Sequence, residues 1–241
     1  MQAVPAHAVP AGPLGVRWLG YEVGELQAGV EGRARVELEN AGSAPWHDLL
    51  VSYHWLDDLD NAISWDGLRN PLPPLAPGER ATAELTVLGP IPPGRYRLAF
   101  DLVLERRYWL SEIGNDLLAV DVEVAKRDAS GRVAHLPPDV EPAPDWDELT
   151  RAAHEEGYAA VGGSIDAGRR RELRPYAPGG GRNPSFTEPL VCPSLLPPLA
   201  PNCTVAGLPA WRPETAEPWL HEPSIYDGRI RARLRSGRRP A

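Results

Sequence analysis

Apolar and polar residues alternate along several short runs in the first half of the chain. In the clearest run, 95–105, Leu98, Phe100 and Leu102 share one phase, and polar residues occupy most of the other. An alternation with period two is typical of a strand that buries one face. The same pattern predicts further strands over 16–23, 33–39, 49–57, 80–87 and 117–124. None of these runs has the 3.6-residue period of a helix over a useful length.

Turn-forming residues separate these runs. Proline, glycine and asparagine gather at 40–45, 76–79 and 92–94, where they favour tight changes of chain direction. Six to eight short strands without intervening helices predict two antiparallel sheets packed face to face, a β-sandwich. A charged residue in place of Phe100 should therefore unfold this domain.

The pattern changes along the chain and divides it into four parts. Residues 1–15 have no periodicity and are predicted to be a flexible leader, and 16–125 form the sandwich. The proline-rich stretch 126–144 is interpreted as a linker. Residues 145–241 are rich in proline and glycine, and we expect a mostly irregular region with one or two short helices and a basic terminal strand. The predicted fold class is therefore mainly β.

The second half nevertheless contains a few recognisable elements. Residues 145–156 predict a helix, with Asp145 as its N-cap and Glu148 at the reciprocal position of a capping box. A short strand is expected at 158–165, a second short helix at 166–174 and an edge strand at 226–235. The stretch 175–223 is proline-rich but too apolar for a simple linker, so we expect an extended segment that wraps over another surface.

Charge and hydropathy exclude some classes of partner. The chain has 33 acidic and 25 basic residues, a net charge of −8, which argues against binding to nucleic acid or to a membrane surface. No apolar run is long enough to span a bilayer, and the first residues do not resemble a secretion signal. A cytoplasmic location with reduced cysteines is therefore expected, although the pairing of Cys192 and Cys203 stays open.

Motifs for catalysis, metal binding or cofactor binding are weak. The acidic pairs Asp58–Asp60 and Asp145–Asp147 lack the alternating β–α pattern of a nucleotide-binding domain, and a calcium site around Asp58 has little support. The histidines and cysteines lack the spacings of zinc sites, and the glycine runs do not form a phosphate loop. We therefore predict no catalytic residue, no metal and no cofactor. An enzyme that uses His154, Asp166 and Arg182 is a distant alternative.

Residues 16–125 also resemble a known family. The resemblance lies in the strings ENAGSAPW, LLVSYHWLD, SWDGLRNPLPPLAPGE and PPGRYRLAFDLVLERRYWLSEIGN, which begin at residues 39, 49, 64 and 92. They are similar to a bacterial immunoglobulin-like module appended to actinobacterial glycosyltransferases and other enzymes of surface-polysaccharide biosynthesis. Leu110 departs from the pattern, which would place an aromatic residue after Trp109. The resemblance implies a sandwich with an accessory role near glycan chemistry, and it does not imply catalysis.

Seven residues are the candidates for a glycan site, because aromatic rings stack on the apolar faces of sugars and polar groups bind their hydroxyls. They are Trp65, Trp109, Tyr108, Trp46, Asp66, Arg69 and Glu112. The alternative is that these aromatic side chains fill the sandwich core, as expected for Trp18 and Trp55.

Two functional hypotheses follow from these features. In the first, a non-catalytic accessory module binds or positions a glycan, or docks on an enzyme that synthesises one. In the second, a structural or protein-interaction protein assembles through its C-terminal arm, with a homo-oligomer as one outcome. The sequence identifies neither the ligand nor the oligomeric state.

Overall fold

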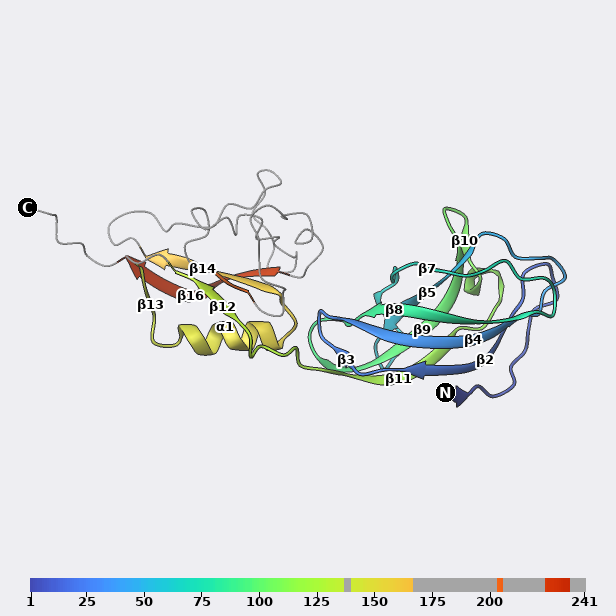
Figure 1. The fold of residues 1–241 in the computed structure, drawn as a ribbon, viewed down its shortest axis with the longest axis horizontal. Helices are drawn as coiled ribbons and strands as arrows, with labels where there is room; N and C mark the ends of the chain where they lie inside the picture. The colour runs from blue at the N-terminus through green and yellow to red at the C-terminus, as the bar shows by residue number, and fades with distance from the viewer. Residues whose placement is uncertain (137–139, 167–202, 206–223, 235–241) are drawn as a thin grey trace, which may run out of the picture. The chain divides into compact units, whose positions relative to one another are not determined.

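The computed structural model describes residues 1–136, 140–166, 203–205 and 224–234 (Figure 1). The chain divides into two compact units, Met1–Ala125 and Lys126–Ala241. Strands dominate both units, so the predicted mainly β fold is confirmed. Three features of the sequence analysis lie outside the described residues, wholly or for the most part. They are the second short helix predicted at 166–174, the proline-rich stretch 175–223 and Cys192.

The first unit consists of two sheets. One sheet has the order β1-β2-β4-β8 and is antiparallel throughout. Its strands are β1 (Gln2–Ala3), β2 (Val16–Val23), β4 (Glu31–Asn40) and β8 (Arg80–Leu88). The other sheet has the order β3-β11-β9-β5-β6, antiparallel except for the short β3–β11 pair. Its strands are β3 (Leu26–Gln27), β5 (Leu49–Leu56), β6 (Ala62–Ser64), β9 (Gly94–Leu104) and β11 (Leu118–Ala125).

Short elements extend the second sheet at β5 and β9. Strand β7 (Asn70–Pro71) pairs with β5, and β10 (Tyr108–Trp109) folds back on the end of β9. A single 3-10 turn, η1 (Ser111–Ile113), follows β10. These elements bring residues 65–69 and 108–112 to the middle of the sheet.

One hydrophobic core lies between the two sheets of the first unit. The predicted inward phase of 95–105 is confirmed at Leu98, Phe100 and Leu102, which are fully buried. Trp18 and Trp55 are also in this core, as expected, and their indole nitrogens donate to backbone carbonyls. Burial of each large apolar side chain contributes about 1.5–3 kcal/mol to the stability of the unit.

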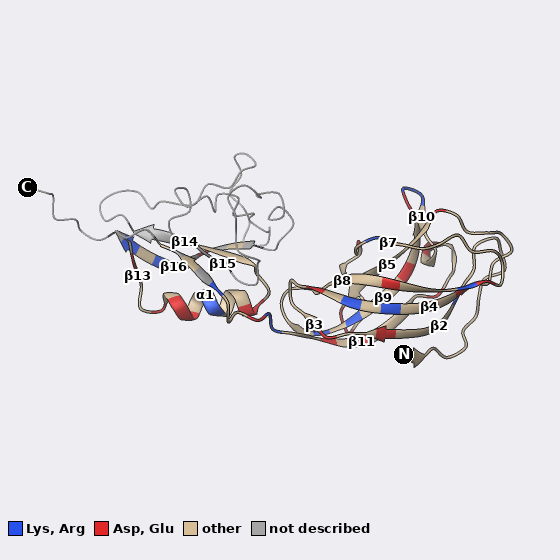
Figure 2. Cartoon of the chain, viewed as in Figure 1, with Lys and Arg blue, Asp and Glu red and all other residues tan. Residues whose placement is uncertain are grey.

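The outer faces of the strands carry charged residues in the alternate phase (Figure 2). On the first sheet Arg35 pairs with Glu84 at 2.6 Å, directly across β4 and β8. Arg17 and Arg80 both pair with Glu39, at 2.6 and 3.0 Å. Exposed pairs of this kind each stabilise a protein by at most about 1 kcal/mol, so the core and not these pairs holds the sheets together.

The prediction of a flexible leader at 1–15 is wrong, because this segment is hydrogen-bonded to the first sheet. Strand β1 pairs with β2, and the Val4 amide donates to the Leu19 carbonyl at 3.1 Å. Further along, the carbonyls of Gly12 and Gly15 accept backbone hydrogen bonds from residues 43 and 41. Its alanines and prolines show no periodicity because the contacts are made mainly by the backbone.

The described part of the second unit is a sheet with one helix. The sheet has the order β12-β15-β14-β16-β13, and β14 and β16 are parallel. Its strands are β12 (Val133–His135), β13 (Val140–Pro142), β14 (Ala160–Asp166), β15 (Cys203–Val205) and β16 (Ser224–Leu234). Helix α1 (Trp146–Glu155) packs on it through Trp146 and Ala153, which contact Val161 and Ile230.

Three expectations for the second unit are corrected. The linker predicted at 126–144 contains β12 and β13, which belong to the sheet. The strand predicted at the C-terminal edge is β16, which lies between β14 and β13. Helix α1 forms where predicted, but the side chain of Asp145 makes no capping hydrogen bond. No helix in the described ranges is long and apolar enough to cross a membrane.

Candidate functional site

A histidine and an aspartate are buried on the outer side of the second sheet. Alternation along β5 sends Tyr53 and Trp55 into the core, so Ser52 and His54 face outward. Asp101 faces the same way from the neighbouring strand β9. Nevertheless His54 is 0% and Asp101 1% exposed. The segments 65–69 and 108–112 cover them.

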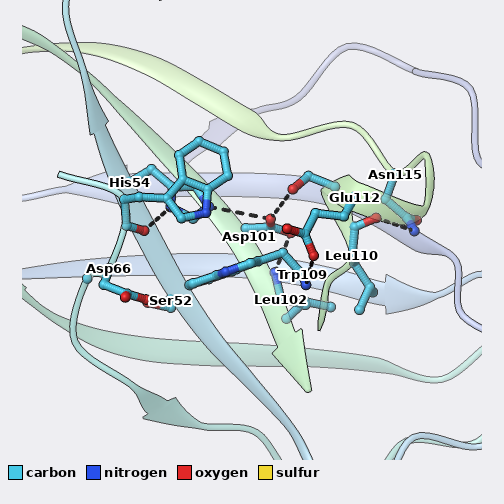
Figure 3. A network of polar contacts seen from close by, with 12 residues as sticks. Ser52, His54, Asp66, Asp101, Leu102, Trp109, Leu110, Glu112 and Asn115 are labelled. Carbon is cyan, nitrogen blue, oxygen red and sulfur yellow. Dashed lines mark hydrogen bonds and ion pairs between the residues drawn. The ribbon is translucent and has the colours of Figure 1, made fainter. Parts of the chain in front are cut away.

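Asp101 receives hydrogen bonds at both of its carboxylate oxygens (Figure 3). Oδ2 accepts from the Ser111 hydroxyl at 2.6 Å, and Oδ1 accepts from the Leu102 amide at 2.7 Å. His54 Nε2 lies 3.4 Å from Oδ2. The other ring nitrogen, Nδ1, donates to the carbonyl of Trp65. The imidazole is therefore held at both nitrogens, and its plane is fixed.

The fixed imidazole supports two tryptophans. The His54 and Trp65 rings stack with centroids 3.8 Å apart and planes 15° apart. Trp109 meets His54 edge-on at 4.4 Å and Trp65 edge-on at 6.4 Å. Trp109 is only 8% exposed, whereas Trp65 is 40% exposed. Trp65 is thus the member of this cluster that presents a large aromatic surface to solvent.

Arg69 ties the covering segments to the sheet. Its guanidinium carbon lies 4.7 Å from the centre of the Trp109 ring, a cation–π contact. Nη1 donates to the Gly67 carbonyl at 2.7 Å and to Ser52 Oγ at 3.2 Å. Nη2 donates to Asp66 at 2.8 Å, and Nε donates to Glu105. Partial burial of the guanidinium tends to lower the pKa of Arg69. The hydrogen bonds and charges of Asp66 and Glu105 outweigh this effect, so the pKa of Arg69 is raised.

Five of the seven predicted site residues meet in this cluster. Trp65, Trp109, Asp66 and Arg69 are in the contacts above, and Glu112 accepts a hydrogen bond from the Trp109 amide at 3.0 Å. Tyr108 is half-buried and packs against the sandwich core.

Trp46 does not belong to the site. It is 1% exposed, pairs through its backbone with Leu75 and lies in the sandwich core, so its ring cannot stack on a ligand. The expectation that Trp46 contacts a glycan is therefore corrected.

Four polar residues of the site escaped the sequence analysis: Ser52, His54, Asp101 and Ser111. One signal is present in the sequence. Asp101 stands between Phe100 and Leu102 in an otherwise apolar run, where an unpartnered charge would be costly. A buried carboxylate in such a place indicates a partner from elsewhere in the chain.

The histidine, aspartate and serine are not arranged for nucleophilic catalysis. That chemistry needs a serine hydroxyl within reach of the imidazole that activates it. Here Ser111 donates to Asp101, and both His54 and Asp101 are closed off from solvent. What the geometry does provide is a rigid support beneath Trp65.

Other candidate centres lack ligand geometry. The Asp57 carboxylate accepts from the Leu59 and Asn61 amides and from the Asn61 side chain, and the contacts to Asn61 hold the pKa of Asp57 below its usual range. In the described ranges no group of three histidine, cysteine or acidic residues could hold a metal ion. His154 is buried in α1, where Nδ1 donates to the Tyr158 carbonyl at 2.7 Å, and Arg182 lies outside the described residues.

Comparisons with known proteins give little further information. No family model matches the chain, and no curated protein does. Among solved structures the chain is similar to a family 123 glycoside hydrolase from Clostridium perfringens, which was described in connection with glycolipid glycan hydrolysis. The identity is 14% and the TM-score 0.26, over 41% of this chain and 22% of the hydrolase. A likeness this low supports no argument about fold or function.

Proposed function

We propose that the first unit is a non-catalytic accessory module that binds or positions a glycan through Trp65. The observation that carries the proposal is the state of this one ring. Trp65 is 40% exposed, yet it is stacked on a buried histidine that holds its backbone carbonyl. An exposed tryptophan fixed in this way loses little conformational freedom when a ligand stacks on it.

The chemistry around Trp65 suits a sugar. The apolar C–H face of a pyranose packs well on an indole, and carboxylates accept hydrogen bonds from sugar hydroxyls. Asp66 and Glu105 are both exposed, and Arg69 forms an ion pair with each of them and so orients both. The resemblance of residues 16–125 to immunoglobulin-like modules of polysaccharide-synthesis enzymes points to the same class of ligand.

Binding to a panel of oligosaccharides, measured by isothermal titration calorimetry, tests the proposal. The panel contains neutral, amino, uronic and phosphorylated glycans. We expect saturable binding of at least one class, and a loss of about tenfold or more in Trp65→Ala. Trp65→Phe, which keeps an aromatic ring, should bind within a few-fold of the unmodified chain.

Leu59→Ala is the matched control, because it also removes an exposed apolar side chain of the same segment. It should leave glycan affinity unchanged. Absence of saturable binding to every member of the panel, or equal loss in the Leu59 and Trp65 variants, would contradict the glycan proposal.

Docking on a protein is the second part of the proposed function. It is favoured by a separate observation, the accumulation of exposed apolar side chains around β6. Assembly of the chain through its C-terminal arm also stays a hypothesis, since most of that arm lies outside the described residues.

A further inference from the structure

Basic side chains line a pocket of about 640 Å³ in the second unit, beside the last turn of α1. All of its lining residues belong to this unit. The charged ones are four cations and two carboxylates: Lys126, Arg127, Arg132, Arg151, Asp128 and Glu155. The pocket therefore has an excess of positive charge, although the net charge of the whole chain is −8.

Arg127 fixes the shape of this pocket. Its amide donates to the Glu155 carbonyl at 3.1 Å, and its Nη1 donates to the Gly157 carbonyl at 3.2 Å. These bonds satisfy carbonyls at the C-terminal end of α1, and Arg127 is only 6% exposed. The segment that begins at Lys126 is thereby held against the helix, so the pocket is not formed by long exposed side chains alone.

Two of the cations share a single carboxylate. Lys126 Nζ lies 2.8 Å from Glu155 Oε2, and Arg151 Nη1 lies 3.0 Å from Glu155 Oε1. The hydrogen bonds from Lys126 and Arg151 hold the pKa of Glu155 below its usual range, so this group is charged at neutral pH. One negative charge does not neutralise two positive ones. Because the Lys126 and Arg151 side chains are 69% and 48% exposed, both can also contact an anion from solution.

The remaining acidic groups leave the excess in place. Arg132 pairs with Asp147 at 2.5 Å, and Asp128 accepts a hydrogen bond from the amide two residues later. With Asp147 included, four cations face three carboxylates. The positive charge also acts on a neighbouring group: in addition to burial, the charges of Arg127 and Arg132 lower the pKa of His154.

We propose that this pocket binds a phosphate group. A phosphate ester carries about 1.5 to 2 negative charges at neutral pH and has three acceptor oxygens, so it can contact cations that approach from different segments. Lys126 supplies a compact charge and Arg151 a planar pair of donors, whereas Arg127 and Arg132 add positive charge from less exposed positions. This site lies in the second unit and does not depend on the glycan proposal.

The experiment titrates inorganic pyrophosphate into the full chain by calorimetry at low and high salt. We expect saturable one-to-one binding that weakens several-fold at high salt, because the contacts are exposed charges. Succinate, a dicarboxylate with less charge and fewer acceptor oxygens, should bind at least several-fold more weakly. A hexose 1-phosphate and a nucleoside diphosphate carry the same group, and the tighter of the two identifies the source of the phosphate.

Variants of the chain locate the contact. Lys126→Gln and Arg151→Gln should each weaken pyrophosphate binding about threefold or more. Glu155→Gln should strengthen it by a similar factor, because it removes the carboxylate that competes with the ligand for both cations. Exposed ion pairs contribute at most about 1 kcal/mol to stability, so these variants should remain folded.

Arg35→Gln is the matched control. Arg35 is 45% exposed and pairs with Glu84 at 2.6 Å in the first unit, so its environment resembles that of Arg151 without the pocket. It should leave pyrophosphate affinity unchanged.

The response to Glu155→Gln separates a ligand site from a set of surface ion pairs. Unchanged or weaker binding of pyrophosphate in this variant would overturn the inference. So would the absence of saturable binding, equal binding of succinate, or equal losses in the Arg35 and Arg151 variants. The glycan proposal is judged separately by the Trp65 variants, so either proposal can fail while the other stands.

Discussion

Asp101 illustrates how a single residue organises the site. A strand position on the outer side of a sheet is normally solvated, but Asp101 is covered by Trp65, Trp109 and Ser111. Its charge is tolerated because a hydroxyl and a backbone amide donate to it and an imidazole faces it. Removal of this carboxylate would leave those donors buried without an acceptor.

We therefore predict that Asp101→Ala lowers the free energy of unfolding by about 3 kcal/mol, measured by urea denaturation of the full chain. Asp121→Ala is the matched control, because the Asp121 side chain is 91% exposed on the adjacent strand. It should change stability by less than about 0.5 kcal/mol. Equal effects of the two substitutions would show that the buried network contributes nothing.

At the residue scale, the sequence predicts the solvent-facing residues of the site better than the buried residues beneath them. Trp65, Asp66 and Arg69 are close in the chain, so their meeting could be anticipated. His54 could not be placed, because alternation alone puts it on a solvated face, and its cover comes from two separate segments, one with Trp65, 11 residues further on, and a more distant one with Trp109. The prediction of Trp46 as a site residue is wrong, because composition does not reveal that it pairs with Leu75 through the backbone and lies in the core.

At the scale of the element, periodicity predicted the long strands and failed for the short ones. Strands β4, β8 and β11 each bury mainly one face over eight or more residues, whereas β9 is buried on both faces from Leu98 to Val103. Strands β12 and β13 have three residues each, and proline is part of β13, so no alternation distinguishes them from a linker. They become strands through pairing with β15 and β16.

Helix α1 carries a histidine whose burial makes the second unit sensitive to acid. Burial lowers the pKa of His154 to about 4, and the positive charges of Arg127 and Arg132 act in the same direction, against the hydrogen bond to Tyr158. An unfolded histidine has a pKa of 6.5. As the pH falls below that value the unfolded chain binds a proton that the folded chain refuses, so stability decreases until about pH 4.

We predict that the free energy of unfolding decreases by about 3 kcal/mol between pH 7 and pH 4, and that this decrease depends on His154. Chemical denaturation of the full chain and of His154→Gln over this range measures it, and the stability advantage of the unmodified chain should shrink as pH falls. His47→Gln changes an exposed histidine and is the control for the substitution itself, with an expected change of less than about 0.5 kcal/mol in stability at pH 7. A difference between His154→Gln and the unmodified chain that stays constant over this pH range would contradict the prediction.

At the scale of the whole molecule, the two units have separate cores. Among the described residues, the buried members of the sandwich core run from Val16 to Val124, with Val4 and Leu14 packed against them, and the α1 core lies between Trp146 and Ile230. The sandwich could be predicted from the sequence because its long strands alternate apolar and polar residues, although β4–β8 and β5–β9 pair across long stretches of chain. The sheet of the second unit could not, because β12 and β13 are too short to show alternation and β16 pairs with β14 across a long intervening segment.

The separate cores predict that a fragment ending at Ala125 folds by itself. It should unfold cooperatively in urea, with the near-ultraviolet circular dichroism of a packed tryptophan core. If the C-terminal arm mediates assembly, sedimentation will show larger species for the full chain and a monomer for the fragment. If the full chain and the fragment are both monomers, the assembly hypothesis is contradicted. If the fragment has no cooperative unfolding transition, the sandwich does not fold independently.

The position of β16 also determines when the second unit can form on the ribosome. Its neighbours β13 and β14 are complete once the ribosome has added Asp166, but β16, the strand that lies between them, begins only at Ser224. Until β16 emerges, the edges of β13 and β14 have no strand between them to pair with. The sandwich, by contrast, already has all of its strands. A premature stop codon before Ser224 would therefore spare the sandwich and leave the rest as a substrate for chaperones and proteases.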